Sequence, residues 1–238
     1  RPFTQWVVED HFTAGRPDWG AVGVSFVKDV EPFELMKLRL LNGSHSTLSY
    51  LGYLAGHETV SDAMSAPGFS ALLAGMMEEE ISPTLPELPG FDLAAYRAEL
   101  LQRFRNPALR HRTWQIAMDG SQKVPQRLLG TIRQRLAAGA PFERLALGLA
   151  GWMVYATGQG ESGEAIDVRD PLAQRLADAT SGRRDAKELL DSYLGFSEVF
   201  GEDLPTSEVF RETVERRLRE LLSEGAARTV ARYGTGAS

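Results

Sequence analysis

The chain has 238 residues, of which 43% are hydrophobic and 24% charged, and this composition is ordinary for a soluble globular protein. Its net charge of −6 argues against a general nucleic-acid-binding surface, which would normally be basic. The absence of cysteine excludes disulfides and zinc–cysteine sites, and the longest apolar runs are too short to span a bilayer. No signal peptide is visible, so we expect a cytoplasmic protein. The first residue is Arg1 rather than Met, which indicates a processed chain or a piece of a longer one.

Apolar residues recur at helical spacing along most of the sequence, so we expect an all-α fold in a single domain. Apolar residues alternate with others over residues 21–27, which are expected to form a strand or an extended segment that leads into the next helix. Loops are expected at 13–20 and 83–90, where glycine and proline are frequent. In chain order, the expected helices cover residues 1–10, 33–56, 59–64, 67–81, 92–104, 107–118, 124–138, 141–157, 170–180, 185–196 and 207–232.

The longest apolar helix, residues 33–56, is expected to organise the rest of the chain. Three polar residues interrupt it: Lys37, Asn42 and His45. At about 100° per residue, Asn42 lies about 140° and His45 about 80° round from Lys37, so all three fit on one broad face. Burying an amine, an amide and an imidazole together is costly unless they meet partners or line a cleft. The helix is therefore either an ordinary core helix with a satisfied histidine or one wall of a functional cleft.

Lysine is rare in this chain, which uses arginine at most of its basic positions. Only four of the 26 basic residues are lysines: Lys28, Lys37, Lys123 and Lys187. Arginine does not give up its proton in a protein, whereas the pKa of a buried lysine shifts readily. A lysine inside an apolar helix, such as Lys37, therefore indicates proton transfer. The alternative is a surface residue that extends its aliphatic side chain so that the ammonium group reaches water.

Three further patterns bear on ligands. Gly158-Gln-Gly-Glu-Ser-Gly163 matches the dinucleotide fingerprint literally, but a helical run precedes it, so we interpret it as a surface turn and expect no cofactor-binding motif.

The Glu78-Glu79-Glu80 run could suggest a metal site. Adjacent residues on a helix point in different directions, which favours a solvated face instead. The four histidines show no metal-ligand spacing, so no metal site is predicted.

The stretch Asp119-Gly-Ser-Gln-Lys123 is expected to be a loop directly before a helix that begins at Val124. Free backbone N–H groups at such a helix N-terminus suit an anion or a sugar hydroxyl. The alternative is an ordinary capped helix with an exposed lysine.

Three sequence segments resemble one known family. The pattern Lys37-Leu-Arg-Leu-Leu-Asn42-Gly-Ser-His45 resembles the K-x4-N-x2-H signature of the long-chain polyol dehydrogenases, the family of mannitol dehydrogenase and fructuronate (D-mannonate) reductase. Phe3-Thr-Gln-Trp-Val-Val-Glu-Asp10 resembles the segment that opens the family's C-terminal domain. Arg103-Phe-Arg-Asn-Pro107, together with residues 111–123, resembles its second block, so the resemblance runs over essentially the whole chain.

The resemblance implies that residues 1–238 form the substrate-binding and catalytic domain of an NAD-dependent oxidoreductase. Its fold would be the multi-helix C-terminal domain of these enzymes, which is similar to that of 6-phosphogluconate dehydrogenase. The family's N-terminal Rossmann domain, which binds most of the NAD, is absent from this chain. The chain alone is therefore expected to be inactive, and that domain is its expected partner.

The resemblance also implies the chemistry. Lys37 would be the acid–base group that takes the hydroxyl proton during oxidation, and Asn42 would stabilise charge on the reacting oxygen. A lysine that works near neutrality needs its pKa lowered from about 10.4 by burial or by a positive charge such as that of Arg39. No metal is needed, because the ammonium and amide groups polarise the substrate.

The remaining implied residues bind the substrate. His45 would orient it, and Lys123 would contact it from the second block, with Arg112 as a further candidate nearby. The substrate would be a sugar acid or a polyol, with fructuronate or mannonate as the first choice and mannitol or fructose as the second. Basic residues near Lys123 could pair with the carboxylate of a hexuronate.

A second interpretation is a non-catalytic helical module that binds a partner or regulates one, and that keeps the same motif for packing. The absence of a nucleotide-binding domain from this chain is its main support. The sequence leaves open the exact sugar, the choice between NAD and NADP, and the oligomeric state.

Overall fold

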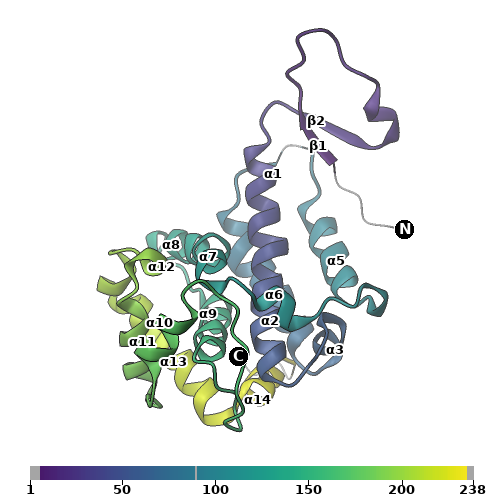
Figure 1. Ribbon diagram of the computed structural model, residues 1–238. Helices are drawn as coiled ribbons and strands as arrows, with labels where there is room; N and C mark the ends of the chain where they lie inside the picture. The colour runs from purple at the N-terminus through teal and green to yellow at the C-terminus, as the bar shows by residue number, and fades with distance from the viewer. Residues whose placement is uncertain (1–5, 89, 235–238) are drawn as a thin grey trace.

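Helices dominate the computed structural model, which describes residues 6–88 and 90–234 (Figure 1). Within these ranges the strands are β1 (Trp6–Glu9) and β2 (Val24–Val27), so the expected all-α class is confirmed. The α-helices are α1 (Glu31–Met36), α2 (Ser44–Leu54), α3 (Val60–Ser65), α4 (Phe69–Gly75), α5 (Leu93–Phe104), α6 (Thr113–Ala117), α7 (Gly120–Val124), α8 (Gly130–Ala137), α9 (Glu143–Ala156), α10 (Ala173–Thr180), α11 (Ala186–Leu194), α12 (Ser197–Phe200), α13 (Glu208–Glu224) and α14 (Ala226–Ala231). The π-helical segments are η2 (Lys37–Gly43), η3 (Met76–Ile81) and η6 (Pro125–Leu129), and the short 3-10 turns are η1 (Trp19–Val22), η4 (Ser82–Thr84), η5 (Pro107–Leu109), η7 (Leu204–Thr206) and η8 (Arg232–Gly234).

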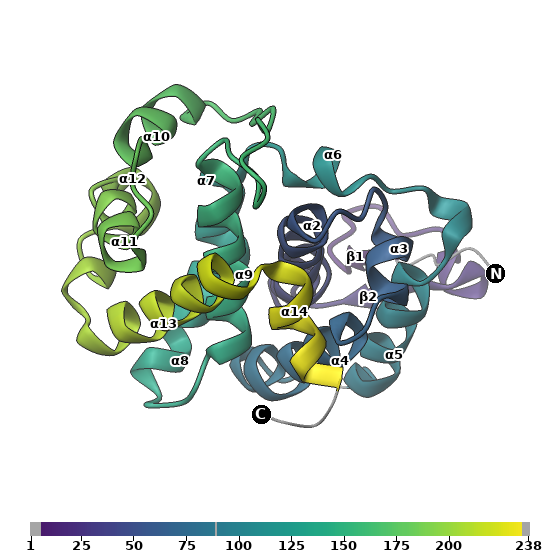
Figure 2. The ribbon, with the colours of Figure 1, turned by 90° about the horizontal axis from the view of Figure 1, so that it is seen from below.

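The core is built around α9, in which every residue from Leu145 to Ala156 is buried. A helix that is apolar on every side needs neighbours that cover all its faces. Helices α2 and α13 pack along it, and α7 also contacts it (Figure 2). Gly148 allows α2 to approach closely, because a Cβ atom there would lie 2.3 Å from Thr47 Oγ1. Although α9 is apolar, no helix among the described residues has the length and hydropathy to cross a membrane.

The helix expected over residues 33–56 is present as one continuous helix of α1, η2 and α2, from Glu31 to Leu54 (Figure 1). Pro32 lies in its first turn, where the missing N–H of proline leaves no hydrogen bond unmade. Gly56, at φ 83°, follows its C-terminal end, where a left-handed residue commonly closes a helix. Helix α2 packs against both α9 and α6, so this long helix connects the core to the second family-like block.

The N-terminal segment differs from expectation. The prediction of a short helix over residues 1–10 is wrong for residues 6–10, because Trp6–Glu9 forms strand β1. Residues 1–5 lie outside the described residues. Strand β1 pairs in parallel with β2, and Trp6 lies opposite Val24. Aromatic and β-branched residues favour this extended conformation. The expected strand over 21–27 is confirmed by β2, and Figure 1 shows the pair beyond the start of α1, away from the helical body.

Three helix boundaries also differ. The helix expected over 107–118 is wrong, because Arg110 adopts a left-handed conformation at φ 40° and α6 begins only at Thr113. The helix expected from Val124 begins already at Gly120 and runs through α7, η6 and α8. The helix expected over 207–232 is broken at Gly225, at φ 79°, a conformation that glycine adopts without steric cost.

Candidate active site

Lys37, Asn42 and His45 lie on the single continuous helix, as expected, but the helix is π-helical where the motif begins. Hydrogen bonds in a π-helix run between residues five apart, so Lys37 and Asn42 lie one turn apart, one above the other. Asn42 and His45 are three residues apart and are also neighbours along the helix surface. The π-helical segment thus places the three side chains on a narrower face than regular α-helical spacing allows.

The exposure of the three side chains differs along this face. Lys37 is exposed, whereas Asn42 and His45 are half-buried. Of the two alternatives for Lys37, the side chain that reaches the surface is therefore the one seen among the described residues. The face is open at the Lys37 end and closed at the His45 end.

Close packing between backbones fixes the position of this face. Segment η2 packs against η6 and η3, and all three segments are π-helical. A Cβ atom on Gly43 would lie 2.8 Å from the carbonyl oxygen of Arg127 in η6. Only glycine permits this approach, so the contact sets the position of Asn42 and His45 relative to η6.

Arg39, a candidate source of positive charge near Lys37, makes packing contacts. Its buried guanidinium Nη1 donates to the carbonyl oxygen and Oγ1 of Thr84, both at 2.9 Å, and to Gln134 Oε1 at 2.6 Å. These bonds hold η4 and α8 against η2.

His45 lies in an apolar and positively charged environment. Its ring packs on Phe104, with centroids 4.4 Å apart, and meets the edge of His111 at 5.9 Å. Burial, followed by the positive charges of His111, Arg103 and Arg127, lowers the pKa of His45 to about 3. Its Nε2 atom is buried without a hydrogen-bond partner among the described residues. At neutral pH the ring is therefore an uncharged imidazole with one nitrogen left for a ligand.

Arg127 is a candidate that the sequence motifs did not reveal. It is half-buried, and its Nη1 donates to Ser46 Oγ at 3.1 Å, next to His45. Burial lowers the pKa of its guanidinium. The sequence held one signal, because Arg127 follows Lys123 by four residues and such residues are neighbours on a helix.

The two substrate-binding candidates of the second block lie in different surroundings. Lys123 belongs to α7, where its Nζ donates to the Met118 carbonyl oxygen at 2.6 Å and lies 3.6 Å from Asp119 Oδ2. Arg112 is exposed, and its Nε lies 3.7 Å from Glu58 Oε1. Their assignment to substrate binding stays a prediction.

The helix N-terminus beside Lys123 already has a partner from a distant part of the chain. Asp170 accepts hydrogen bonds from Ser121 N at 2.7 Å and from Ser121 Oγ at 2.6 Å. The expectation of free N–H groups for an anion or a sugar hydroxyl in the 119–123 segment is therefore wrong at Ser121. This carboxylate satisfies the helix end internally.

The Glu78-Glu79-Glu80 run contributes to packing. Glu79 pairs with Arg144 at 2.8 Å, and buried Glu80 accepts hydrogen bonds from the backbone N–H groups of Arg144 and Leu145, both at 2.9 Å. The expected solvated face is therefore wrong for Glu80, which caps the start of α9. Among the described residues, no group of three or more metal-ligating side chains is close enough to hold a metal ion.

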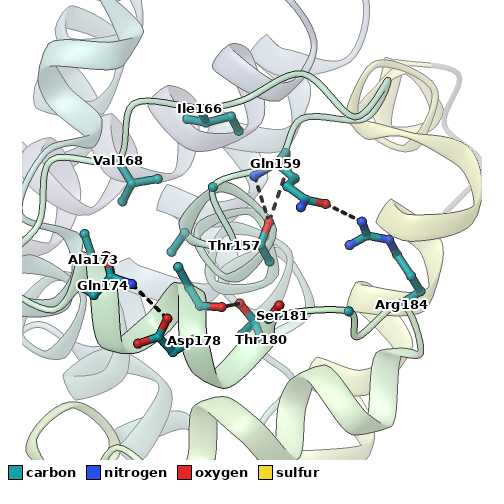
Figure 3. A pocket seen from close by; sticks show the side chains of 14 residues that line it. Thr157, Gln159, Ile166, Val168, Ala173, Gln174, Asp178, Thr180, Ser181 and Arg184 are labelled. Carbon is teal, nitrogen blue, oxygen red and sulfur yellow. Dashed lines mark hydrogen bonds between the residues drawn. The ribbon is translucent and has the colours of Figure 1, made fainter.

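The glycine-rich segment 158–163 forms a surface turn, as expected, closed by a bridge between Gln159 and Ala165. It borders a cavity of about 430 Å³ between the end of α9 and α10 (Figure 3). Neutral polar and apolar side chains both line this cavity, and Arg184 on its rim donates to the side chain of Gln159. None of the η2 residues lines it.

The sequence is similar to a known family and to named proteins. Residues 29–222 match the family model described as the mannitol dehydrogenase C-terminal domain. The chain is 50% identical over 230 residues to D-mannonate oxidoreductase of Escherichia coli (strain K12), covering 97% of this chain and 47% of that protein. It is 40% identical over 236 residues to mannitol 2-dehydrogenase of Aspergillus fumigatus (strain ATCC MYA-4609 / CBS 101355 / FGSC A1100 / Af293). This match covers 98% of this chain and 46% of that protein.

The fold matches solved structures of the same kind. A ternary complex of Pseudomonas fluorescens mannitol 2-dehydrogenase with NAD and D-mannitol superposes with a TM-score of 0.88 at 37% identity, covering 99% of this chain and 47% of that one. A D-sorbitol dehydrogenase in substrate-free form superposes with a TM-score of 0.81 at 31% identity, covering 96% of this chain and 46% of that one. The chain thus spans about half the length of the relatives it matches.

Proposed function

Since this chain belongs to the mannitol dehydrogenase C-terminal domain family, we propose that it is the substrate-binding and catalytic domain of an NAD-dependent oxidoreductase. The proposed reaction interconverts a secondary alcohol and a ketone on a sugar acid or a polyol. One observation carries this proposal: the π-helical segment aligns Lys37, Asn42 and His45 on one face that is open at the lysine end.

In the proposed mechanism, Lys37 Nζ accepts the proton of the substrate hydroxyl during oxidation and returns it during ketone reduction. The amide of Asn42 donates a hydrogen bond to the reacting oxygen and stabilises its developing charge. His45 orients the substrate as a neutral imidazole, since its pKa is about 3. Lys123 and Arg112 contact more distant groups of the substrate.

NAD, when bound, accepts or supplies the hydride in this proposal. The described residues do not by themselves fit a dinucleotide, because the glycine-rich segment 158–163 lies in a surface turn rather than between a strand and a helix. We therefore assign NAD binding mainly to an N-terminal Rossmann domain of the parent protein, which would be this chain's partner.

The β1–β2 pair supports such a partner. An isolated two-stranded sheet is only marginally stable in water. Trp6 is 53%, Phe12 37% and Val22 78% exposed, and the ring of Trp6 stacks on Trp19 with centroids 5.5 Å apart. We propose that the nucleotide-binding domain covers this aromatic arm, defined as residues 6–27.

For the substrate we propose fructuronate or mannonate first, and mannitol or fructose second. The higher identity to a D-mannonate oxidoreductase than to a mannitol 2-dehydrogenase supports this order. The test is a screen of the parent protein against hexuronates, ketoses and polyols with NADH or NAD. Nucleotide-dependent turnover of one class is the expected result, and turnover of none would favour a non-catalytic module.

A further inference from the structure

Basic side chains lie around His45. His111 lies beside its ring, and the charges of Arg103 and Arg127 also act on it. No carboxylate is among the groups that perturb His45 or Arg127. The charges that act on His45 are therefore all positive.

Arg127 lacks the carboxylate partner that several other shielded arginines of the chain have. Arg133 pairs with Asp203 at 2.6 Å, Arg144 with Glu79 at 2.8 Å and Arg217 with Glu143 at 2.8 Å. Within the described ranges, Arg127 has a single side-chain hydrogen bond, to Ser46, and no carboxylate at ion-pair distance. A guanidinium has five donors, and a half-buried one without a counter-ion carries a desolvation cost that an anion would offset.

Arg127 lies next to the helix face that carries Lys37, Asn42 and His45. Its backbone touches Gly43 and its side chain touches Ser46, and these residues directly follow Asn42 and His45 in the sequence. His45 Nε2 is a second polar atom at this end without a partner among the described residues. The guanidinium of Arg127 can donate two parallel hydrogen bonds to a planar anion, and the neutral imidazole of His45 can add a third.

We propose that Arg127 and His45 bind the carboxylate of a sugar-acid substrate, and that Arg127 thereby selects a sugar acid over a neutral polyol. This inference rests on the proposed function. Lys37 at the open end then acts on the alcohol carbon while the carboxylate is held at the closed end.

The test compares D-mannonate with D-mannitol, which carry a carboxylate and a hydroxymethyl group at the same end. In the parent protein, Arg127→Gln should lower kcat/KM for D-mannonate by about 10- to 100-fold, the range expected for losing a charged hydrogen bond. It should change kcat/KM for D-mannitol by less than about threefold, because that substrate has no charge to lose. Arg127→Lys should retain part of the activity on D-mannonate.

Arg133→Gln is the matched control, because Arg133 lies further along the same continuous helix and is already paired with Asp203. It should leave the ratio of the two kcat/KM values unchanged. An equal loss on both substrates in Arg127→Gln, or no loss on D-mannonate, would overturn the inference.

A binding measurement separates this inference from the proposed function. D-mannonate should raise the Tm of the parent protein, and Arg127→Gln should reduce that shift, whether or not turnover occurs. Absence of turnover with a shift that depends on Arg127 would defeat the proposed function alone. A D-mannonate shift that is absent, or equal in both proteins, would defeat the carboxylate site.

Discussion

Lys37 and His45 lie on one helix but in opposite surroundings. Lys37 is exposed and makes no hydrogen bond or ion pair with another described residue. His45 is enclosed by the ring of Phe104 and by three positively charged or basic neighbours. A change at Lys37 therefore tests chemistry with little effect on folding, whereas a change at His45 also affects stability.

If Lys37 is the acid–base group, Lys37→Ala in the parent protein should lower kcat and kcat/KM together by about 10²- to 10⁴-fold. Lys37→Arg should rescue little, because a guanidinium cannot accept the proton. Added primary amines should restore part of the rate of the alanine variant. Steady-state kinetics measure these effects.

The Tm of both Lys37 variants should stay near that of the wild type, since the side chain is exposed. A folded Lys37→Arg enzyme with near-wild-type kcat would contradict the proposed mechanism.

His45 should make the folded state sensitive to acid. Its pKa in the folded state is about 3, below the ordinary value of about 6.5, so between these values the unfolded chain binds more protons. The contribution of His45 to stability is thus complete above about pH 6.5 and is lost progressively as the pH falls toward 3. Free energies of unfolding measured from pH 4 to 7 should rise with pH, and His45→Gln should flatten the slope.

His11→Gln is the control for this pH dependence, because His11 is exposed. It should leave the slope unchanged. An unchanged slope in His45→Gln would contradict the assignment.

At the scale of elements, the contact between η2 and η6 determines the shape of the site. Both segments are π-helical, a form that is rare and frequently occurs at functional sites. Pro125 begins η6, and its missing N–H fits a helix whose hydrogen-bond spacing is changed. The two wide turns meet at Gly43, between Asn42 and the buried Ser44.

Gly43→Ala should push these two segments apart, because the new Cβ would lie 2.8 Å from a backbone oxygen that cannot rotate away. We expect a loss of about 1–3 kcal/mol in the free energy of unfolding, typical of overpacking. Activity of the parent protein should also fall, because Asn42 and His45 move relative to η6. Chemical denaturation and kinetics measure the two effects.

Gly130→Ala is the matched control, since a Cβ atom there would meet its nearest neighbour at 3.8 Å within the same helical region. It should be neutral or slightly stabilising, as alanine favours helix. Equal losses in the two variants would contradict the role of the Gly43 contact.

At the scale of the whole molecule, the aromatic arm is separate from the helical body (Figure 1). If the nucleotide-binding domain covers the arm, Val22→Asp in the parent protein should place a charge in an interface. The expected cost is about 1–3 kcal/mol, measured as the free energy of unfolding. Val209→Asp, on a residue that is 59% exposed at the start of α13, should cost little, because a carboxylate is favoured at a helix N-terminus. Equal effects of the two substitutions would count against the proposed interface.

Local sequence patterns are enough to predict the class of fold and the helix that carries the motif residues. Apolar periodicity is a local property, so it correctly predicted the long helix at 33–56. The K-x4-N-x2-H spacing likewise identified the helix that carries the candidate site. These features depend on neighbours along the chain, which the sequence displays directly.

The surroundings of each motif residue on that helix depend on tertiary contacts. The π-helical segment, the low pKa of His45 and the position of Arg127 all arise from contacts between segments that are distant in sequence. The same holds for Asp170, which caps a helix 49 residues away. Periodicity indicates that a residue is on an apolar face, but burial and charge depend on which elements pack against that face, and this is set by the whole fold.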